Sequence, residues 1–274
     1  MYSVEEMKKL ANVIRYDTLK AIHVVGSGHP GGCLSAVDIL TVLYFHTLRI
    51  DPNNPKWPER DRFLLSKGHA APALFATLAH RGFFDIHELL HLRLHDGRLQ
   101  ATPNLKIPGA DSVSGSLGQN LSIGVGYALA ARMDHLDYKT FVMLGDGEME
   151  EGQNWEAIMS ASAFRLGNLI GILDNNHVQM CGTVEEILPY GCMADKFRAF
   201  GWHVVEVNGH DIAALIEVFD ALPTQPDGAP TIIIADTVKG KGVSFMEGKA
   251  AWHGGSPDTE QMKQIELELG GGTL

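Results

Sequence analysis

The chain has 274 residues, of which 45% are hydrophobic and 20% are charged, and its formal net charge is −11. This length suits one large α/β domain. The acidic balance argues against a general nucleic-acid-binding protein. No apolar run is long enough to cross a membrane.

The N-terminal residues lack the basic and apolar regions of a signal peptide. The three cysteines, Cys33, Cys181 and Cys192, show no metal-ligand spacing, and their odd number does not favour a disulfide framework. We therefore expect a cytoplasmic protein that binds neither nucleic acid nor membrane.

The predicted helices and strands alternate along the chain. Met7, Leu10, Ala11 and Ile14 share one face of a first helix over residues 4–25. Further helices are predicted at 34–48, up to 78, near 86–94, and at 121–132, 154–166 and 212–222. Short apolar runs predict strands at 63–66, 141–144, 169–173, 202–207 and 231–235.

This alternation predicts a doubly wound parallel sheet with helices on both faces. We expect a single domain spanning residues 1–274. Residues 26–32 and 95–118 are predicted loops, because they are rich in glycine and other turn-forming residues. The polar segment 259–274, which contains three consecutive glycines, is expected to be a flexible tail.

The most informative segment begins with Gly145-Asp146-Gly147, directly after the strand at 141–144. The next strand ends at Asp174-Asn175-Asn176. Parallel strands of a strand-helix-strand unit end at the same edge of the sheet, so Asp146 and Asn176 should lie side by side. Their oxygen atoms suit Mg²⁺ or Ca²⁺, which could hold a diphosphate.

Four further segments place histidine or lysine beside glycine. His29 lies within Gly26–Gly32, and His69 follows Ser66-Lys67-Gly68. Lys239 and Lys241 alternate with glycines after the last strand, and His253 precedes Gly254. Each segment is either an ordinary solvated turn or a place where a side chain meets an anion or exchanges a proton.

Together these segments resemble the pattern of thiamine diphosphate enzymes. Glu148-Met149-Glu150-Glu151-Gly152 and Leu173-Asp174-Asn175-Asn176 narrow the resemblance to transketolases, over about residues 8–258. The resemblance implies a thiamine diphosphate-binding fold of the diphosphate-binding type. It also implies that Asp146, Asn176 and the backbone carbonyl of Val178 bind Mg²⁺, Ca²⁺ or Mn²⁺, and that the backbone of Gly147 contacts the diphosphate.

The resemblance extends to residues around the reacting carbon. It implies that His69 and His253 lie near the diphosphate and that His29 and His253 are catalytic, with His29 relaying protons. The loop containing Ser116 and Leu117 would follow the contour of the cofactor. Glu151 would belong to a carboxylate network that connects two active sites of a dimer.

The chain departs from the transketolase pattern in two ways. Its sequence shows no pyrimidine-binding domain, which supplies the glutamate that activates the cofactor, and no smaller carboxyl-terminal domain. We therefore expect a partner subunit carrying both domains, an α₂β₂ assembly, and no activity of this chain alone. In addition, Thr102 occupies the place of a family histidine that contacts the donor sugar.

The expected reaction is transfer of a two-carbon ketol unit from a ketose phosphate to an aldose phosphate. Because Thr102 replaces a histidine, a non-standard donor is an alternative, such as apulose 4-phosphate, which is branched, or a sulfonated ketose. Two functions of a different kind stay open: that of the α subunit of a 2-oxo acid dehydrogenase and that of a non-catalytic scaffold subunit.

Overall fold

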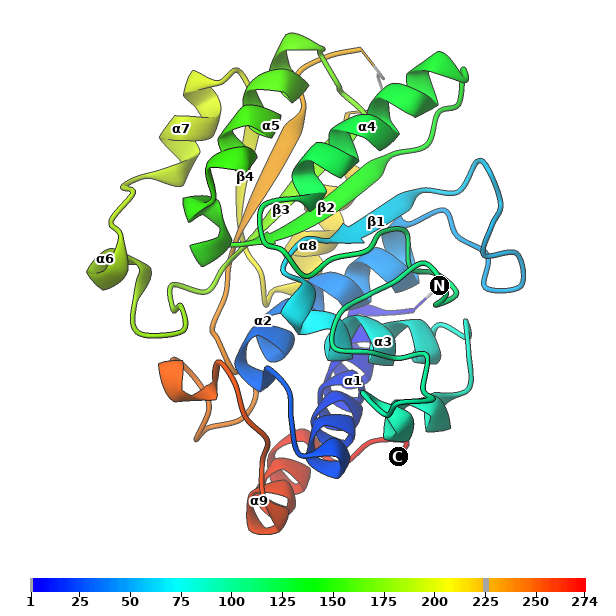
Figure 1. Cartoon of the computed structure of the whole chain (residues 1–274), viewed down its shortest axis with the longest axis vertical. Coiled ribbons are helices and arrows are strands. Elements are labelled where there is room, and N and C mark those ends of the chain that lie inside the picture. The colour runs from blue at the N-terminus through cyan, green and yellow to red at the C-terminus, as the bar shows by residue number, and fades with distance from the viewer. Residues whose placement is uncertain (1, 224–226) are drawn as a thin grey trace.

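The computed structural model, which describes residues 2–223 and 227–274, is built around one parallel sheet (Figure 1). In the described residues the sheet has five strands in the order β1-β2-β3-β5-β4, and every neighbouring pair is parallel. Their bounds are Arg62–Leu65 (β1), Thr140–Gly145 (β2), Leu169–Asn175 (β3), His203–Asn208 (β4) and Thr231–Asp236 (β5).

Helices cover both faces of this sheet (Figure 1). Phe141 and Met143 of β2 point into one apolar layer, and the alternating Val142 and Leu144 point into the other, as the period of two in a strand requires. The first layer contains α1 (Val4–Val25), α2 (Pro30–Val42), α3 (Ala71–His80) and α8 (Ile212–Asp220). The second contains α4 (Asn120–Met133), α5 (Gly152–Ala163) and α7 (Met193–Ala199). The predicted doubly wound fold is confirmed.

The first helix follows its sequence pattern closely. Ser3 and Glu6 form a capping box at the N-terminus of α1, and Gly26 ends the helix with φ 72°. Met7 and Ile14 on the predicted apolar face are fully buried. Helix α1 thus occupies the residues that its periodicity predicts.

The glycine-rich segment 26–32 differs from the prediction in its second half. Pro30 begins α2, so residues 30–32 form a helical turn rather than a loop. Proline suits this position because the first turn of a helix leaves its N–H groups unpaired and requires the φ that proline already has. The helix continues past Val42 as a π-helical turn, Leu43–Thr47, and the segment near residue 86 is a 3₁₀ helix, Ile86–His91.

The expectation of a flexible tail is wrong for most of its residues. Residues Thr259–Leu269 form helix α9, which begins at a capping box between Asp258 and Gln261. Met262 and Ile265 of α9 bury themselves in a cluster with Leu19 of α1. The exposed residues of the helix are polar apart from Leu267, and its narrow buried apolar stripe is easily overlooked when only the overall polarity of the segment is considered. The short helix α6 (Val184–Ile187) and α7 were not predicted either.

No helix in the described ranges has the length and hydropathy needed to cross a bilayer.

Candidate active site

The tips of β2 and β3 meet at one cavity. Gly145 pairs in register with Asp174, so Asp146 and Asn176 follow the ends of adjacent strands. Asp146 is only 3% exposed and Asn176 only 7% exposed. Both line a cavity of about 160 Å³, as does Val178. The predicted juxtaposition at the carboxyl edge is therefore present.

Asp146 is held in place by backbone donors. The N–H groups of Gly147 (2.8 Å) and His177 donate to its two carboxylate oxygens. Burial and the nearby carboxylate of Asp174 raise the pKa of Asp146 to about 6. A buried carboxylate whose charge is disfavoured in this way is a strong attractor for a divalent cation.

Asp174 lies beneath the cavity in an ion pair that the site prediction did not include. It accepts hydrogen bonds from the Lys67 ammonium, Ser35 (2.6 Å) and Thr237. Burial raises the pKa of Asp174, but the Lys67 charge and these hydrogen bonds outweigh burial and hold that pKa below its ordinary value. Lys67 and Asp174 are both fully buried, so each charge depends on the other.

Glu148 is a second residue that the sequence did not single out by itself. Its buried carboxylate accepts hydrogen bonds from the hydroxyl of Ser66 and from the N–H groups of Gly118 (2.8 Å) and Gly145 (3.1 Å). One side chain thus joins the end of β1, the end of β2 and the loop that carries Leu117. Nothing in the acidic run 148–151 distinguishes the buried glutamate from its exposed neighbour Glu151.

Three histidines from distant segments form one cluster. The ring centroids of His29, His69 and His253 lie 5.2–5.5 Å apart. Burial and the neighbouring Lys67 lower the pKa of His69 to about 2, and burial and Lys239 lower that of His253 to about 4. Burial also lowers the pKa of His29. All three rings are therefore neutral at pH 7.

The neutral state of His69 has a consequence for stability. Its pKa falls from 6.5 to about 2 on folding, so below pH 6.5 the unfolded chain binds a proton that the native state does not. Between pH 7.5 and pH 5 we expect the wild type to lose about 2 kcal/mol more stability than the His69→Gln variant. Urea denaturation of both proteins at the two pH values measures this difference, and parallel losses would contradict it.

Lys239 reaches the cavity from the loop after β5. Its ammonium donates to the carbonyl of Val178 (2.7 Å) and lies 3.0 Å from Nδ1 of His253. Burial and the charge of Lys67 lower the pKa of Lys239 to about 8, so it still carries a positive charge at pH 7. The sequence marked this segment as a possible anion site but did not assign the residue.

The structure gathers most of the predicted site residues and leaves two outside. Seven line the cavity: His69, Leu117, Asp146, Gly147, Asn176, Val178 and His253. His29 makes edge-to-face contacts with the rings of His69 and His253 but does not line the cavity. Ser116 and Glu151 are exposed beyond the lining residues. Thr102 lies beside the loop that carries Ser116 and Leu117. A Cβ built on Gly115 of that loop would be 3.8 Å from the Thr102 side chain.

Comparisons with known proteins agree with this geometry. The family described as "Transketolase, thiamine diphosphate binding domain" matches residues 6–272. The 6-deoxy-6-sulfo-D-fructose transketolase subunit of Clostridium sp. strain MSTE9 is 44% identical over 265 residues, which cover 96% of each chain. One subunit of the apulose-4-phosphate transketolase of Phocaeicola vulgatus is 40% identical over 266 residues, which cover 97% of this chain and 94% of that one.

A solved structure extends the similarity to three dimensions. The transketolase of Pichia stipitis superimposes with a TM-score of 0.91 at 30% identity. The alignment covers 99% of this chain but 41% of that protein, so the chain corresponds to one part of a full-length transketolase. On the family match and these alignments, the chain belongs to the transketolase family and carries its thiamine diphosphate-binding domain.

Proposed function

We propose that this chain binds the diphosphate end of thiamine diphosphate in a two-subunit transketolase. The complex would transfer a two-carbon ketol unit from a ketose phosphate to an aldose phosphate. The observation that carries the proposal is the cavity at the strand tips, where Asp146 and Asn176 face Lys239 and the histidine cluster. The family assignment favours this reaction over that of a 2-oxo acid dehydrogenase.

The cavity residues fit a metal diphosphate. The donor set consists of the Asp146 carboxylate, the Asn176 side-chain oxygen and the Val178 carbonyl, all hard oxygen ligands of the kind Mg²⁺ prefers. The Val178 carbonyl accepts from Lys239 with one lone pair, and its second lone pair would serve the metal. Among the described residues, no three acidic, histidine or cysteine side chains form a metal cluster, so the diphosphate itself would supply further oxygens. Mg²⁺ is the expected ion, with Ca²⁺ or Mn²⁺ as substitutes.

Two glycines at the cavity pack closely against neighbouring side chains. A Cβ on Gly147 would meet the Gln179 side chain at 2.9 Å, and a Cβ on Gly32 would lie 3.2 Å from the His69 ring. Within the described chain, the buried Nδ1 of His29 has no hydrogen-bond partner. A close-fitting wall and an unpaired ring nitrogen are what a polar ligand would complete.

Thiamine diphosphate, when bound, supplies the electron sink for breaking the carbon–carbon bond of the ketose. The chain's own residues position it and move protons. Neutral His29, whose ring contacts His69 and His253, would relay protons in this proposal. Because Lys239 donates to Nδ1 of His253, that ring carries its proton on Nε2 and can donate a hydrogen bond there. Lys239 and Lys67 offset the negative charge of the diphosphate.

The pyrimidine end of the cofactor needs a second subunit in this proposal. Two relatives of nearly the same length are named as transketolase subunits, which supports a split enzyme. The partner would carry the pyrimidine-binding and carboxyl-terminal domains, and the assembly would be a cytoplasmic α₂β₂ complex. Exposed Glu151, at the start of α5, is available for the carboxylate network between active sites.

The partner requirement is tested by assaying the purified chain with thiamine diphosphate, Mg²⁺, a ketose phosphate and an aldose phosphate. We expect no turnover until the partner subunit is added. Turnover by the chain alone would contradict the proposal. If the complex binds the cofactor but transfers nothing with any donor, the chain is a scaffold subunit instead.

The donor sugar depends on Thr102 in this proposal. Threonine is shorter than histidine and leaves space for a branched or sulfonated donor, and both kinds of sugar appear in the names of relatives. In the complex, Thr102→His is expected to raise kcat/KM for xylulose 5-phosphate relative to apulose 4-phosphate or a sulfonated ketose by about tenfold. An unchanged ratio would show that Thr102 does not set donor choice.

A further inference from the structure

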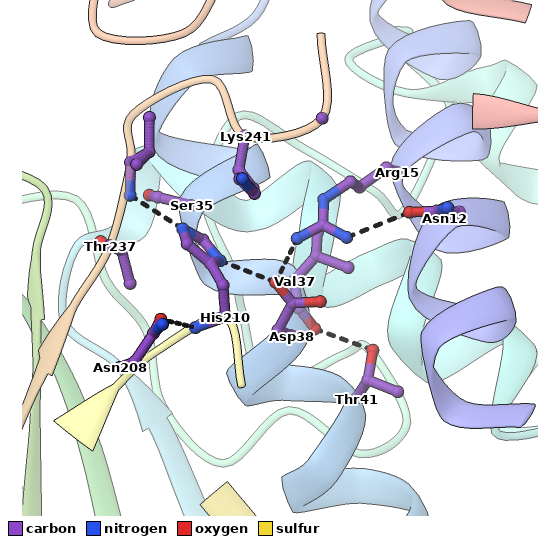
Figure 2. Close-up of polar contacts among 12 residues, drawn as sticks. Asn12, Arg15, Ser35, Val37, Asp38, Thr41, Asn208, His210, Thr237 and Lys241 are labelled. Atoms are coloured by element: carbon purple, nitrogen blue, oxygen red, sulfur yellow. Dashed lines mark hydrogen bonds and ion pairs between the residues drawn. The ribbon is translucent and has the colours of Figure 1, made fainter. Parts of the chain in front are cut away.

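A buried chain of hydrogen bonds leads from α1 to the loop that carries Lys239. Figure 2 shows the Asp38 carboxylate lying between the Arg15 guanidinium and the ring of His210. Arg15 donates to Asp38, whose Oδ2 lies 2.7 Å from Nδ1 of His210. On its other side, Nε2 of His210 lies 2.8 Å from the backbone N–H of Val238. The three side chains are 4–11% exposed.

The backbone N–H of Val238 determines which ring nitrogen of His210 carries the proton. The N–H of Val238 can only donate, so Nε2 of His210 must be the unprotonated acceptor. Nδ1 then carries the proton and donates it to Asp38. The ring is therefore neutral, in one tautomer, and both of its nitrogens are used.

Arg15 keeps Asp38 ionised, so that Asp38 can accept the hydrogen bond that Nδ1 of His210 donates. Burial raises the pKa of Asp38, but the Arg15 charge and the hydrogen bonds from His210 and Arg15 outweigh burial, so the pKa lies below its ordinary value. Asp38 is therefore ionised at pH 7 and acts as an acceptor. Arg15 also lies within reach of Asn12 (3.4 Å), which helps to fix its guanidinium (Figure 2).

The loop that donates this hydrogen bond continues directly to Lys239, which lines the cavity. The carbonyl of Lys239 accepts from Gly248 (2.8 Å), and the N–H of Gly240 donates to Gly31 (3.0 Å). Those two contacts are between backbone groups. The carbonyl of Val238 likewise accepts from the Lys241 N–H (3.1 Å), but its own N–H is held by a side chain. Val238 directly precedes the lysine that contacts Val178 and His253.

We propose that His210 is a positioning residue that fixes the backbone at Val238 and thereby places the Lys239 ammonium between the Val178 carbonyl and His253. His210 does not line the cavity. The proposal rests on the proposed function only in taking the Lys239 cavity as the site for Mg²⁺ and thiamine diphosphate. The hydrogen-bond geometry at His210 is independent of that function.

The tautomer can be measured in the wild-type chain without any substitution. In the ¹⁵N spectrum of histidine-labelled protein at pH 7, we expect one buried ring with protonated Nδ1 and unprotonated Nε2, assigned by its loss in His210→Gln. A ring assigned to His210 that is protonated at Nε2 would overturn the proposal. This result does not depend on transketolase activity.

Two substitutions of His210 distinguish the effect of its hydrogen bond to Val238 from that of its hydrogen bond to Asp38. Glutamine is long enough to place its oxygen where Nε2 accepts from Val238, whereas asparagine reaches only toward Asp38. We expect His210→Asn to weaken the affinity for Mg²⁺ and thiamine diphosphate by about tenfold, because the buried Val238 donor loses its acceptor. His210→Gln should retain most of the affinity, and the Val238 amide should exchange faster only in the asparagine variant.

His80→Asn is the matched control. His80 forms a His–Asp pair of the same length, 2.7 Å, with buried Asp17, and its side chain is equally exposed, 11%. It contacts no part of the Lys239 loop in the described residues. Equal losses of cofactor affinity in His80→Asn and His210→Asn would show a general stability effect and overturn the proposal.

Asp38→Ala provides an independent variant if His210→Asn does not fold. Arg15 and Nδ1 of His210 both contact Oδ2 of Asp38, so alanine removes the acceptor that holds the proton on Nδ1 and frees the ring to place a proton on Nε2, against the Val238 N–H. We expect fast Val238 exchange and reduced cofactor affinity with His210 intact. Unchanged exchange would overturn the proposal. A complex that binds the cofactor normally but lacks transketolase activity would instead count against the proposed function.

Discussion

Replacing Asp146 with asparagine is expected to weaken the binding of Mg²⁺ and thiamine diphosphate by more than about 100-fold. Removing a residue that only hydrogen-bonds to a metal ligand already lowers metal affinity by about 10–100-fold, and Asp146 is proposed as a ligand itself. Asparagine keeps the shape of the side chain but removes the charge. Asp146 is the only carboxylate in the proposed ligand set, and it is buried beside Asp174. Isothermal titration calorimetry of the chain and its partner measures the change.

Asp236→Asn is the matched control for this substitution. Asp236 ends β5 at the same edge of the sheet, but its side chain is 72% exposed and pairs with His177 outside the cavity. We expect near wild-type cofactor affinity in this control. If Asp146→Asn also bound the metal and cofactor as tightly as the wild type, the metal site would not lie at the strand tips.

Replacing Lys67 with methionine is expected to lower the free energy of unfolding by about 3–5 kcal/mol, because it leaves the buried charge of Asp174 without its partner. The Lys67 ammonium is the only cation that donates to Asp174 among the described residues. Denaturant unfolding at pH 7 measures the loss. Lys263→Met, which breaks an exposed pair with Glu260 at 2.8 Å, should change stability by less than about 1 kcal/mol.

A double variant tests whether charge is the cause. Asp174→Asn in the Lys67→Met background removes the unpaired charge while keeping an oxygen for Ser35 or Thr237. We expect the double variant to be more stable than Lys67→Met alone. The effects of two independent substitutions would add, so this recovery would show that the two sites are coupled. A double variant that is less stable than either single variant would indicate that packing, not charge, dominates at this position.

The charges around the cavity balance in pairs. Asp174 is matched by Lys67, which lines the cavity, and Asp146 and Lys239 line the same cavity. Asp146 has no direct ion pair among the described residues, and burial and the Asp174 charge raise its pKa. A divalent cation bound to a diphosphate would satisfy Asp146 and leave Lys239 facing phosphate oxygens.

The sequence predicted the strand tips well because the signal there is local. Apolar runs before Asp146 and Asn176 define two buried strands, and the parallel connection between them dictates a shared edge. No other feature of the chain is needed for that inference. The helix at 4–25 was predicted for the same reason, since its cap and its apolar face lie within one segment.

The partners of the buried charges could not be predicted in this way. Lys67 and Asp174 are 107 residues apart, and Asp38 and His210 are 172 apart, so only the folded chain shows that they meet. Glu148 lies in an acidic run whose members look alike until burial separates them. Helix α9 was missed because three apolar residues in a polar segment are enough to anchor a helix against a neighbour that the sequence does not identify.

The central claim is that one divalent ion lies between the tips of β2 and β3. The most direct test is a crystal of the chain with its partner, thiamine diphosphate and Mn²⁺, with data collected for the anomalous signal of manganese. The account predicts a single strong peak bonded to Asp146, Asn176 and the Val178 carbonyl. A manganese peak elsewhere, with the cofactor bound and these three oxygens free of metal, would contradict it.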